Sequence, residues 1–163
     1  MVTLVYLSMM VALAGTVGAV CYGRNVPKSI SALVYQYKPG MQWAWSVWII
    51  AIGALLLVPM MEALDDRLCA LGFLAFAFLV GAAVTPLTNR ETSDWHDWFG
   101  VAAGLMYTAC VAVINPCWLV VWGLYLAVLP FGCMKERLVL VSEVCCAGSL
   151  YGCLIGCYGN AIA

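Results

Sequence analysis

The sequence is poor in charge. Of its 163 residues only 9% are Asp, Glu, Lys or Arg, whereas 66% are hydrophobic. A soluble domain carries about 25% charged residues and needs polar side chains to cover its surface, so the composition favours a membrane protein. The net charge of −1 offers no basic surface for nucleic acid, and we expect no nucleic-acid partner.

The chain also lacks the residue spacings that mark disulfide frameworks and metal sites. Its nine cysteines form no Cys-x-x-Cys pair, and none lies three to five residues from the single histidine. Most fall in apolar runs, where free cysteine packs as a small hydrophobic side chain; a redox pair or a lipidated thiol is the alternative. We therefore expect no metal and no cofactor. So many buried thiols would be at risk in an oxidising compartment, which favours a bacterial inner membrane.

What the chain has instead is a series of apolar runs, each near the length of about 20 residues that a helix needs to cross a bilayer. They predict an all-α, polytopic integral membrane protein, a single domain built as a six-helix bundle. The predicted spans are about 2–22, 41–61, 68–88, 98–114, 117–134 and 138–158. The first run has no basic residues before it, which favours a retained helix over a cleaved signal.

The division of residues 98–134 into two spans depends on a turn and on charge. These 37 residues are too long for one crossing, and Asn115-Pro116 is a turn signal near their middle. The alternative is one kinked helix with a long exposed end. Basic residues gather on the cytoplasmic side of membrane proteins, and six spans leave only Arg67 on the opposite side, with both termini outside. The basic residues that then share one side are Arg24, Lys28, Lys38, Arg90, Lys135 and Arg137.

The connection at residues 23–40 is polar and is bracketed by Pro27 and Pro39. Between the prolines, the stretch SISALVYQY mixes apolar residues with Ser29 and Ser31 and is too short to span. We expect it to lie along the membrane surface or to re-enter the membrane.

Polar groups are densest at residues 89–99, which hold the only histidine, His96, between Asp94 and Asp97. A carboxylate can orient an imidazole for acid/base catalysis or share a metal with it. Catalytic zinc, however, usually has three protein ligands, often several histidines. The alternative is that this segment is the solvent-exposed start of a helix. Ser93 or Asp94 is then the N-cap, and the acidic residues lie near the positive end of the helix dipole.

Glu143 lies inside the last predicted span, where an acidic residue is a functional candidate. The alternative is a local ion pair with Lys135 or Arg137. Six-span threading puts Glu143 on the same side as His96, the SISALVYQY stretch and most of the basic residues. This side is suited to bind a lipid headgroup or a small anionic solute. The expected ligand-binding residues are Ser29, Ser31, Arg90, Lys135 and Arg137.

Two further functions stay open at this stage. One is a membrane-embedded lipid hydrolase or transferase that uses His96 with Asp94 or Asp97. The other is a structural or assembly partner that packs through small residues of the last span. Those residues are Gly148, Gly152 and Gly156, which are spaced four apart. Their face is expected to contact a helix of the same chain, or a second copy in a homo-oligomer, and the partners around the bundle are membrane lipids.

Two simpler packing patterns are also present. In the first run, Ala14–Gly18 and Gly15–Ala19 are pairs of small residues four apart, which allow close helix contact. At the start of the second run, three tryptophans are typical of an aromatic anchor at the membrane interface. They are Trp43, Trp45 and Trp48.

Three short motifs carry a family resemblance. PKSISALVY follows the first span, TPLT ends the third, and a charged segment with one histidine opens the next. In these motifs, across residues 27–104, the chain resembles small six-span membrane proteins of the Frag–DRAM type and of a related domain family of unknown function. The resemblance implies a six-span fold and makes Ser29, Ser31 and His96 residues to test.

Overall fold

The computed structural model describes residues 1–23, 28–38, 40–66, 68–88, 93–130 and 137–159. In this part of the chain every regular element is a helix, so the predicted all-α class is confirmed. The elements are α1 (Val2–Gly23), η1 (Ser31–Gln36), α2 (Gln42–Ala63), α3 (Cys69–Thr88), α4 (Ser93–Ile114), η2 (Pro116–Val121), α5 (Trp122–Val128) and α6 (Leu138–Gly159). The elements η1 and η2 are 3₁₀ helices.

Five of the described helices, α1, α2, α3, α4 and α6, are long and apolar enough to cross a membrane, and Pro116–Val128 is a shorter apolar helix. Large apolar side chains such as Met10, Leu105 and Val144 are exposed on their outer faces. Exposing such an apolar surface to water is unfavourable, whereas exposing it to lipid is not. Helices also suit a lipid environment, because they satisfy their own backbone hydrogen bonds. The chain is therefore an integral membrane protein.

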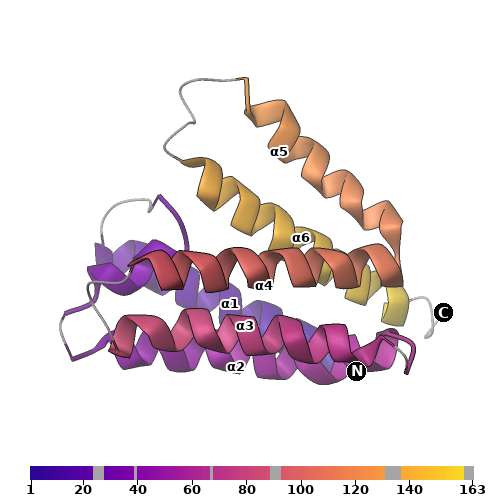
Figure 1. Cartoon of the computed structure of the whole chain (residues 1–163), viewed down its shortest axis with the longest axis horizontal. Coiled ribbons are helices and arrows are strands. Elements are labelled where there is room, and N and C mark those ends of the chain that lie inside the picture. Colours follow the sequence, from indigo (N-terminus) through magenta and orange to yellow (C-terminus); the bar gives the residue numbers. More distant parts are fainter. Residues whose placement is uncertain (24–27, 39, 67, 89–92, 131–136, 160–163) are drawn as a thin grey trace.

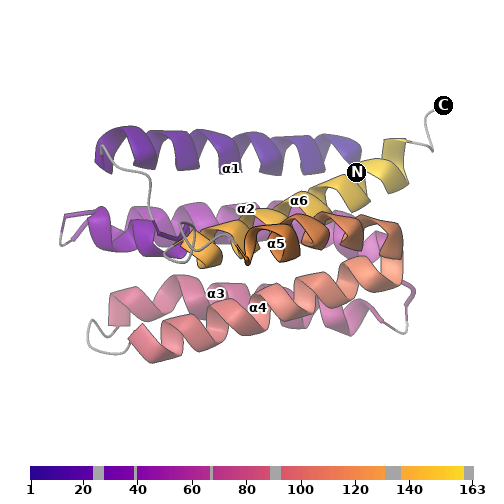
Figure 2. The ribbon, with the colours of Figure 1, turned by 90° about the horizontal axis from the view of Figure 1, so that it is seen from above.

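The helices run in alternating directions, so that Met1 and the end of α6 lie at one end of the bundle and η1 lies at the other (Figure 1). Figure 2 shows α1 on one flank, α3 and α4 on the opposite flank, and α2 and α6 between them. Each of α1 to α4 packs against the next helix in the chain, and α6 packs against α1, α2 and α4.

The chain reverses direction at Asn115, where α4 ends. The Asn115 backbone is extended, and its side-chain oxygen accepts a hydrogen bond from the Cys117 N–H at 3.2 Å. Pro116 then occupies the first turn of η2, where its missing N–H costs nothing. From there η2 packs against α4 and α6, and α5 packs against α6. The predicted fifth span, 117–134, therefore begins within η2. Its last residues, 131–134, lie outside the described part of the chain.

Close contact between α1 and α2 uses one of the two predicted small-residue pairs. The Trp48 indole lies where a side chain on Gly15 would be, and its Nε1–H donates to the Val11 carbonyl oxygen at 2.8 Å. Ala19, one turn further along, is buried. Ala14 and Gly18 are exposed, so only the Gly15–Ala19 face packs against another helix of the chain.

The glycine stripe of α6 packs against η2. A Cβ added to Gly152 would stand 2.3 Å from the Trp118 ring, and one added to Gly156 would stand 3.3 Å from the Trp118 Nε1. Gly148 faces Val121 at an ordinary contact distance of 3.7 Å. Because these glycines have no side chain, the indole of Trp118 can lie flat against the helix backbone. The partner of this face in the structure is thus a segment of the same chain.

Buried hydroxyl groups tie the central helices together. The Ser8 hydroxyl of α1 donates to the Ile52 carbonyl oxygen of α2 at 3.1 Å and lies 2.8 Å from the Tyr151 hydroxyl of α6. The Tyr158 hydroxyl donates to the Pro59 carbonyl oxygen of α2 at 2.6 Å. In an apolar surrounding such groups need partners, so these bonds fix how α6 sits against α1 and α2.

Candidate functional site

A polar cluster lies where η1 covers the end of the bundle opposite the termini. Five residues form this η1 cluster: Ser31 and Tyr35 from η1, Trp45 from α2, His96 from α4 and Glu143 from α6. The apolar residues Leu33 and Val34 of η1 are fully buried in a small core with side chains of α1, α2 and α3. That core holds η1 against the bundle, so η1 is packed on the other helices and is not a loop that lies loosely on the surface.

Glu143 caps the start of η1. Its carboxylate accepts hydrogen bonds from the backbone N–H groups of Ile30 and Ser31, the latter at 3.1 Å. The first N–H groups of a helix have no partner within the helix, and a carboxylate is well placed to accept them. The Leu140 N–H, one turn earlier in α6, donates to the Lys28 carbonyl oxygen at 3.2 Å. The beginning of α6 is therefore joined to the chain leading into η1.

Glu143 contacts a distant part of the chain, and Lys135, one of the two basic residues predicted as a local ion-pair partner, lies outside the described residues. Its carboxylate binds two backbone N–H groups more than 100 residues earlier in the chain. The Ser31 hydroxyl next to it donates to the Ser29 hydroxyl at 3.1 Å. Ser31 thus lies beside Glu143, with Ser29 next to it; their role in binding a ligand stays a prediction.

His96 is buried, with 3% of its surface exposed. Its Nδ1 lies 2.8 Å from the Ala82 carbonyl oxygen of α3. This carbonyl lacks its usual helix partner, because the residue four positions later is Pro86, which has no N–H. A carbonyl oxygen can only accept, so Nδ1 must carry the proton. His96 therefore replaces the backbone donor that Pro86 removed. Its second nitrogen, Nε2, is buried and has no hydrogen-bond partner among the described residues.

Two aromatic rings enclose the imidazole. The Trp45 and His96 ring centroids are 5.9 Å apart, and the Tyr35 ring meets the imidazole edge-on at 6.2 Å. The Trp45 Nε1 is also buried, and none of the residues that the structure describes pairs with it. Glu143 is near enough to interact electrostatically with His96. The cluster thus combines the Glu143 carboxylate, which caps η1, with two ring nitrogens that have no hydrogen-bond partner among the described residues.

Neither Asp94 nor Asp97 pairs with the His96 imidazole as a catalytic or metal-binding arrangement requires. Both side chains are exposed and line a shallow surface hollow with Trp98 and Val101. Successive helix residues are about 100° apart, so the two acids share a face that His96 does not. Among the described residues, no group of three His, Cys, Asp or Glu side chains is arranged to hold a metal ion.

Asp97 acts on Tyr35 instead. Burial raises the pKa of the Tyr35 hydroxyl, and the nearby Asp97 carboxylate raises it further. Both effects disfavour the phenolate. Tyr35 therefore stays a neutral hydroxyl at the edge of the η1 cluster.

The predicted ligand-binding residues fall into two groups. Ser29 and Ser31 lie at the η1 cluster, and Arg137 is exposed just before α6. Arg90 and Lys135 lie outside the described residues. Lys28 and Lys38, on either side of η1, are also exposed at this end of the bundle.

Trp45 was misassigned by sequence reasoning. Only Trp43 of the three tryptophans is well exposed, at 58%, whereas Trp45 is 2% exposed and Trp48 packs against Gly15. The sequence did contain a signal. Residues two positions apart on a helix point to nearly opposite sides, so Trp43 and Trp45 cannot both face the membrane interface.

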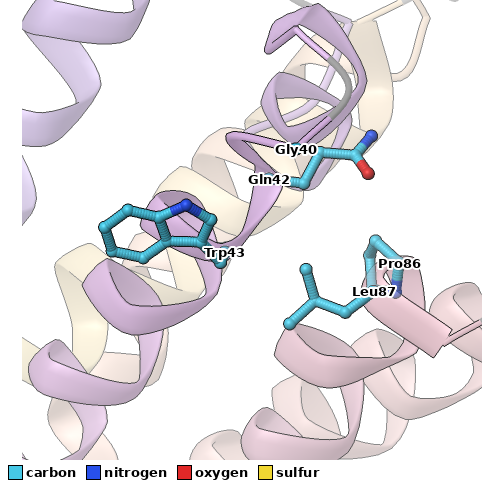
Figure 3. Close-up of a pocket in the computed structure, with 5 residues that line it drawn as sticks. All are labelled: Gly40, Gln42, Trp43, Pro86 and Leu87. Carbon is cyan, nitrogen blue, oxygen red and sulfur yellow. The ribbon is translucent and has the colours of Figure 1, made fainter.

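A second hollow lies beside the η1 cluster, at the start of α2 and the end of α3. Figure 3 shows the Trp43 ring on one side of it and Pro86 and Leu87 on the other. Its volume is about 190 Å³, below the roughly 300–1,000 Å³ of ligand pockets. It is not a site for a whole small molecule.

The chain matches no family model, no curated protein and no solved structure. The resemblance to six-span proteins of the Frag–DRAM type therefore stays a prediction.

Proposed function

We propose that this chain crosses the membrane six times and binds the anionic headgroup of a lipid, or a small anionic solute, at the end covered by η1. This end faces the cytoplasm, and both termini lie on the other side. The observation that carries the binding proposal is the position of the exposed cations Lys28 and Lys38 on either side of η1, with Ser31 at the start of η1 and Ser29 just before it.

The sixth crossing is supported by the reversal at Asn115. After it the chain runs back along α6 through η2 and α5 towards the end that carries η1 (Figure 1). The exposed side chains of η2 and α5 are apolar, including Val120 of η2 at 77% and Leu124 of α5 at 64% exposure. Basic residues favour the cytoplasmic side, which supports the orientation.

Labelling of single introduced cysteines tests the threading, in a background from which the native thiols are removed. Lys38→Cys and Glu136→Cys are expected to react with a membrane-impermeant maleimide from the cytoplasmic side, and Asp66→Cys from the opposite side. A single kinked helix over residues 98–134 would put positions 66 and 136 on the same side. That pattern would end the six-span proposal.

The binding proposal depends on how cations and backbone donors are arranged. The hydrogen bond from the Leu140 N–H to the Lys28 carbonyl oxygen brings the segments of Lys28 and Arg137 together. Because Glu143 already occupies the first N–H groups of η1, an anionic ligand must be held by side chains: the basic residues and the serine hydroxyls. The opposite end carries exposed acids, Glu62, Asp65 and Asp66, which disfavour an anion there.

Lipid retention tests the binding proposal. The purified protein, given equal amounts of phosphatidylglycerol and phosphatidylcholine, is expected to retain the anionic lipid preferentially in native mass spectrometry. A basic residue near anionic lipid contributes about 1 kcal/mol, so Lys28→Gln, Lys38→Gln and Arg137→Gln together should reduce the preference by about tenfold or more. The matched control, Arg67→Gln, changes the basic residue of the α2–α3 connection and should leave the preference intact. Equal retention of both lipids by the unmodified protein would refute the proposal.

A further inference from the structure

The η1 cluster contains two ring nitrogens that are buried and unpaired. Within the part of the chain that the structure describes, His96 Nε2 and Trp45 Nε1 each lack a hydrogen-bond partner, although both residues are more than nine-tenths buried. Buried polar atoms are nearly always paired, and exceptions call for a specific reason. Two such atoms on neighbouring rings, with centroids 5.9 Å apart, point to a shared reason.

The two nitrogens have opposite hydrogen-bonding roles. Because Nδ1 of His96 donates to the Ala82 carbonyl oxygen, Nε2 of the neutral ring carries a lone pair and accepts. The indole nitrogen of Trp45 can only donate. A group that pairs with both must donate once and accept once. A hydroxyl does this, whereas a carboxylate or a phosphodiester anion has no proton to donate to Nε2.

The location of the pair links it to the proposed ligand. Both rings lie under η1, and the exposed Lys28 and Lys38 stand on either side of η1. Tyr35 of η1, whose ring contacts the imidazole, is 48% exposed. A slender group that displaces the exposed Tyr35 side chain would reach the imidazole, while the charged part of the same molecule stays outside with the cations.

We infer that His96 and Trp45 bind a free hydroxyl of the ligand, so that the preferred ligands are anionic phospholipids with a hydroxyl-bearing headgroup. This rests on the proposed function and narrows it to a ligand class. The phosphate is held by the exposed basic residues. The hydroxyl donates to His96 Nε2 and accepts from the Trp45 Nε1–H.

A matched pair of lipids separates the hydroxyl from the charge. Phosphatidylglycerol and phosphatidylpropanol carry the same charge and the same number of headgroup carbons, but only the first has hydroxyls. With identical acyl chains in direct competition, the protein is expected to retain phosphatidylglycerol about tenfold better, as two added hydrogen bonds allow. Trp45→Phe removes one of the two bonds and should reduce this ratio to about threefold, while Trp43→Phe, on the exposed side of α2, should not change it.

The single histidine provides a direct readout that does not depend on stability. With ¹⁵N-labelled histidine, the imidazole should be the Nδ1–H form, and its Nε2 resonance should move in nanodiscs of phosphatidylglycerol relative to phosphatidylpropanol. Free glycerol phosphate tests whether the headgroup alone suffices; a shift with it would assign the site to a soluble phosphate ester. An unchanged Nε2 resonance in all three conditions, or a proton on Nε2 in place of Nδ1, would overturn the inference.

The outcomes distinguish the two proposals. Equal retention of both anionic lipids, still well above phosphatidylcholine, would reject the hydroxyl site and leave anion binding in place. No preference for anionic lipid over phosphatidylcholine would reject the proposed function itself.

Discussion

Replacing Glu143 with alanine is expected to detach η1 from the end of the bundle. The carboxylate is the acceptor for the N–H groups of Ile30 and Ser31, and without it both donors lose their partner. Hydrogen bonds to a charged group contribute about 1.5–3 kcal/mol, so the variant should lose stability on that scale. Hydrogen–deuterium exchange should rise in the peptide covering residues 28–38 and stay unchanged in α2 and α3.

Two variants make the Glu143 result specific. Glu143→Gln keeps a side-chain oxygen that can still accept one of the two bonds, so its exchange should be intermediate. Glu62→Ala removes an exposed acid at the opposite end and should behave like the unmodified protein. If Glu143→Ala left exchange in residues 28–38 at its original rate, the carboxylate would not be what holds η1.

Gly152→Ala is expected to lower the thermal stability of the protein in detergent by disturbing the contact between α6 and η2. The added methyl group would stand 2.3 Å from the Trp118 ring, which is rigid and cannot bend away. Overpacking of this kind costs about 1–3 kcal/mol. The loss should appear as a lower melting temperature and as a change in tryptophan fluorescence.

Gly148→Ala is the matched control, because its added methyl group would meet Val121 at 3.7 Å, an ordinary contact. In a Trp118→Leu background the cost of Gly152→Ala should largely disappear, since the clashing ring is gone. A different outcome would favour a homo-oligomer through this face: Gly152→Ala would then abolish self-association while leaving the melting temperature of the monomer unchanged.

The helices were predictable because lipid simplifies the problem. Apolar runs of span length appear directly in the sequence, and the helices α1 to α4 and α6 fall on the predicted spans. The turn at Asn115-Pro116 was also readable, because both residues act locally. The 3₁₀ form of η1 and its burial were not, because they depend on contacts with Trp45 and Ala83 in other helices.

At the candidate site too, local features could be predicted from the sequence and long-range contacts could not. Sequence reasoning found His96, Glu143, Ser29 and Ser31, because polar groups are conspicuous in an apolar chain. One of the two hypotheses for His96 paired it with the neighbouring acids, whereas in the structure its Nδ1 binds a carbonyl group 14 residues earlier. Pro86 was the available signal, since a proline inside a helix leaves one carbonyl group in need of a donor.

The short return path after Asn115 has a consequence for the lipid around the protein. A 3₁₀ helix rises about 2.0 Å and an α-helix about 1.5 Å per residue, so Pro116–Val128 measures roughly 22 Å against a hydrocarbon thickness of about 30 Å. Within the described residues, acyl chains beside Val120 and Leu124 therefore meet a shorter apolar helix than those beside α1. Hydrophobic mismatch is relieved by local thinning of the bilayer. The bilayer around this protein should therefore vary in thickness and be thinnest along α5.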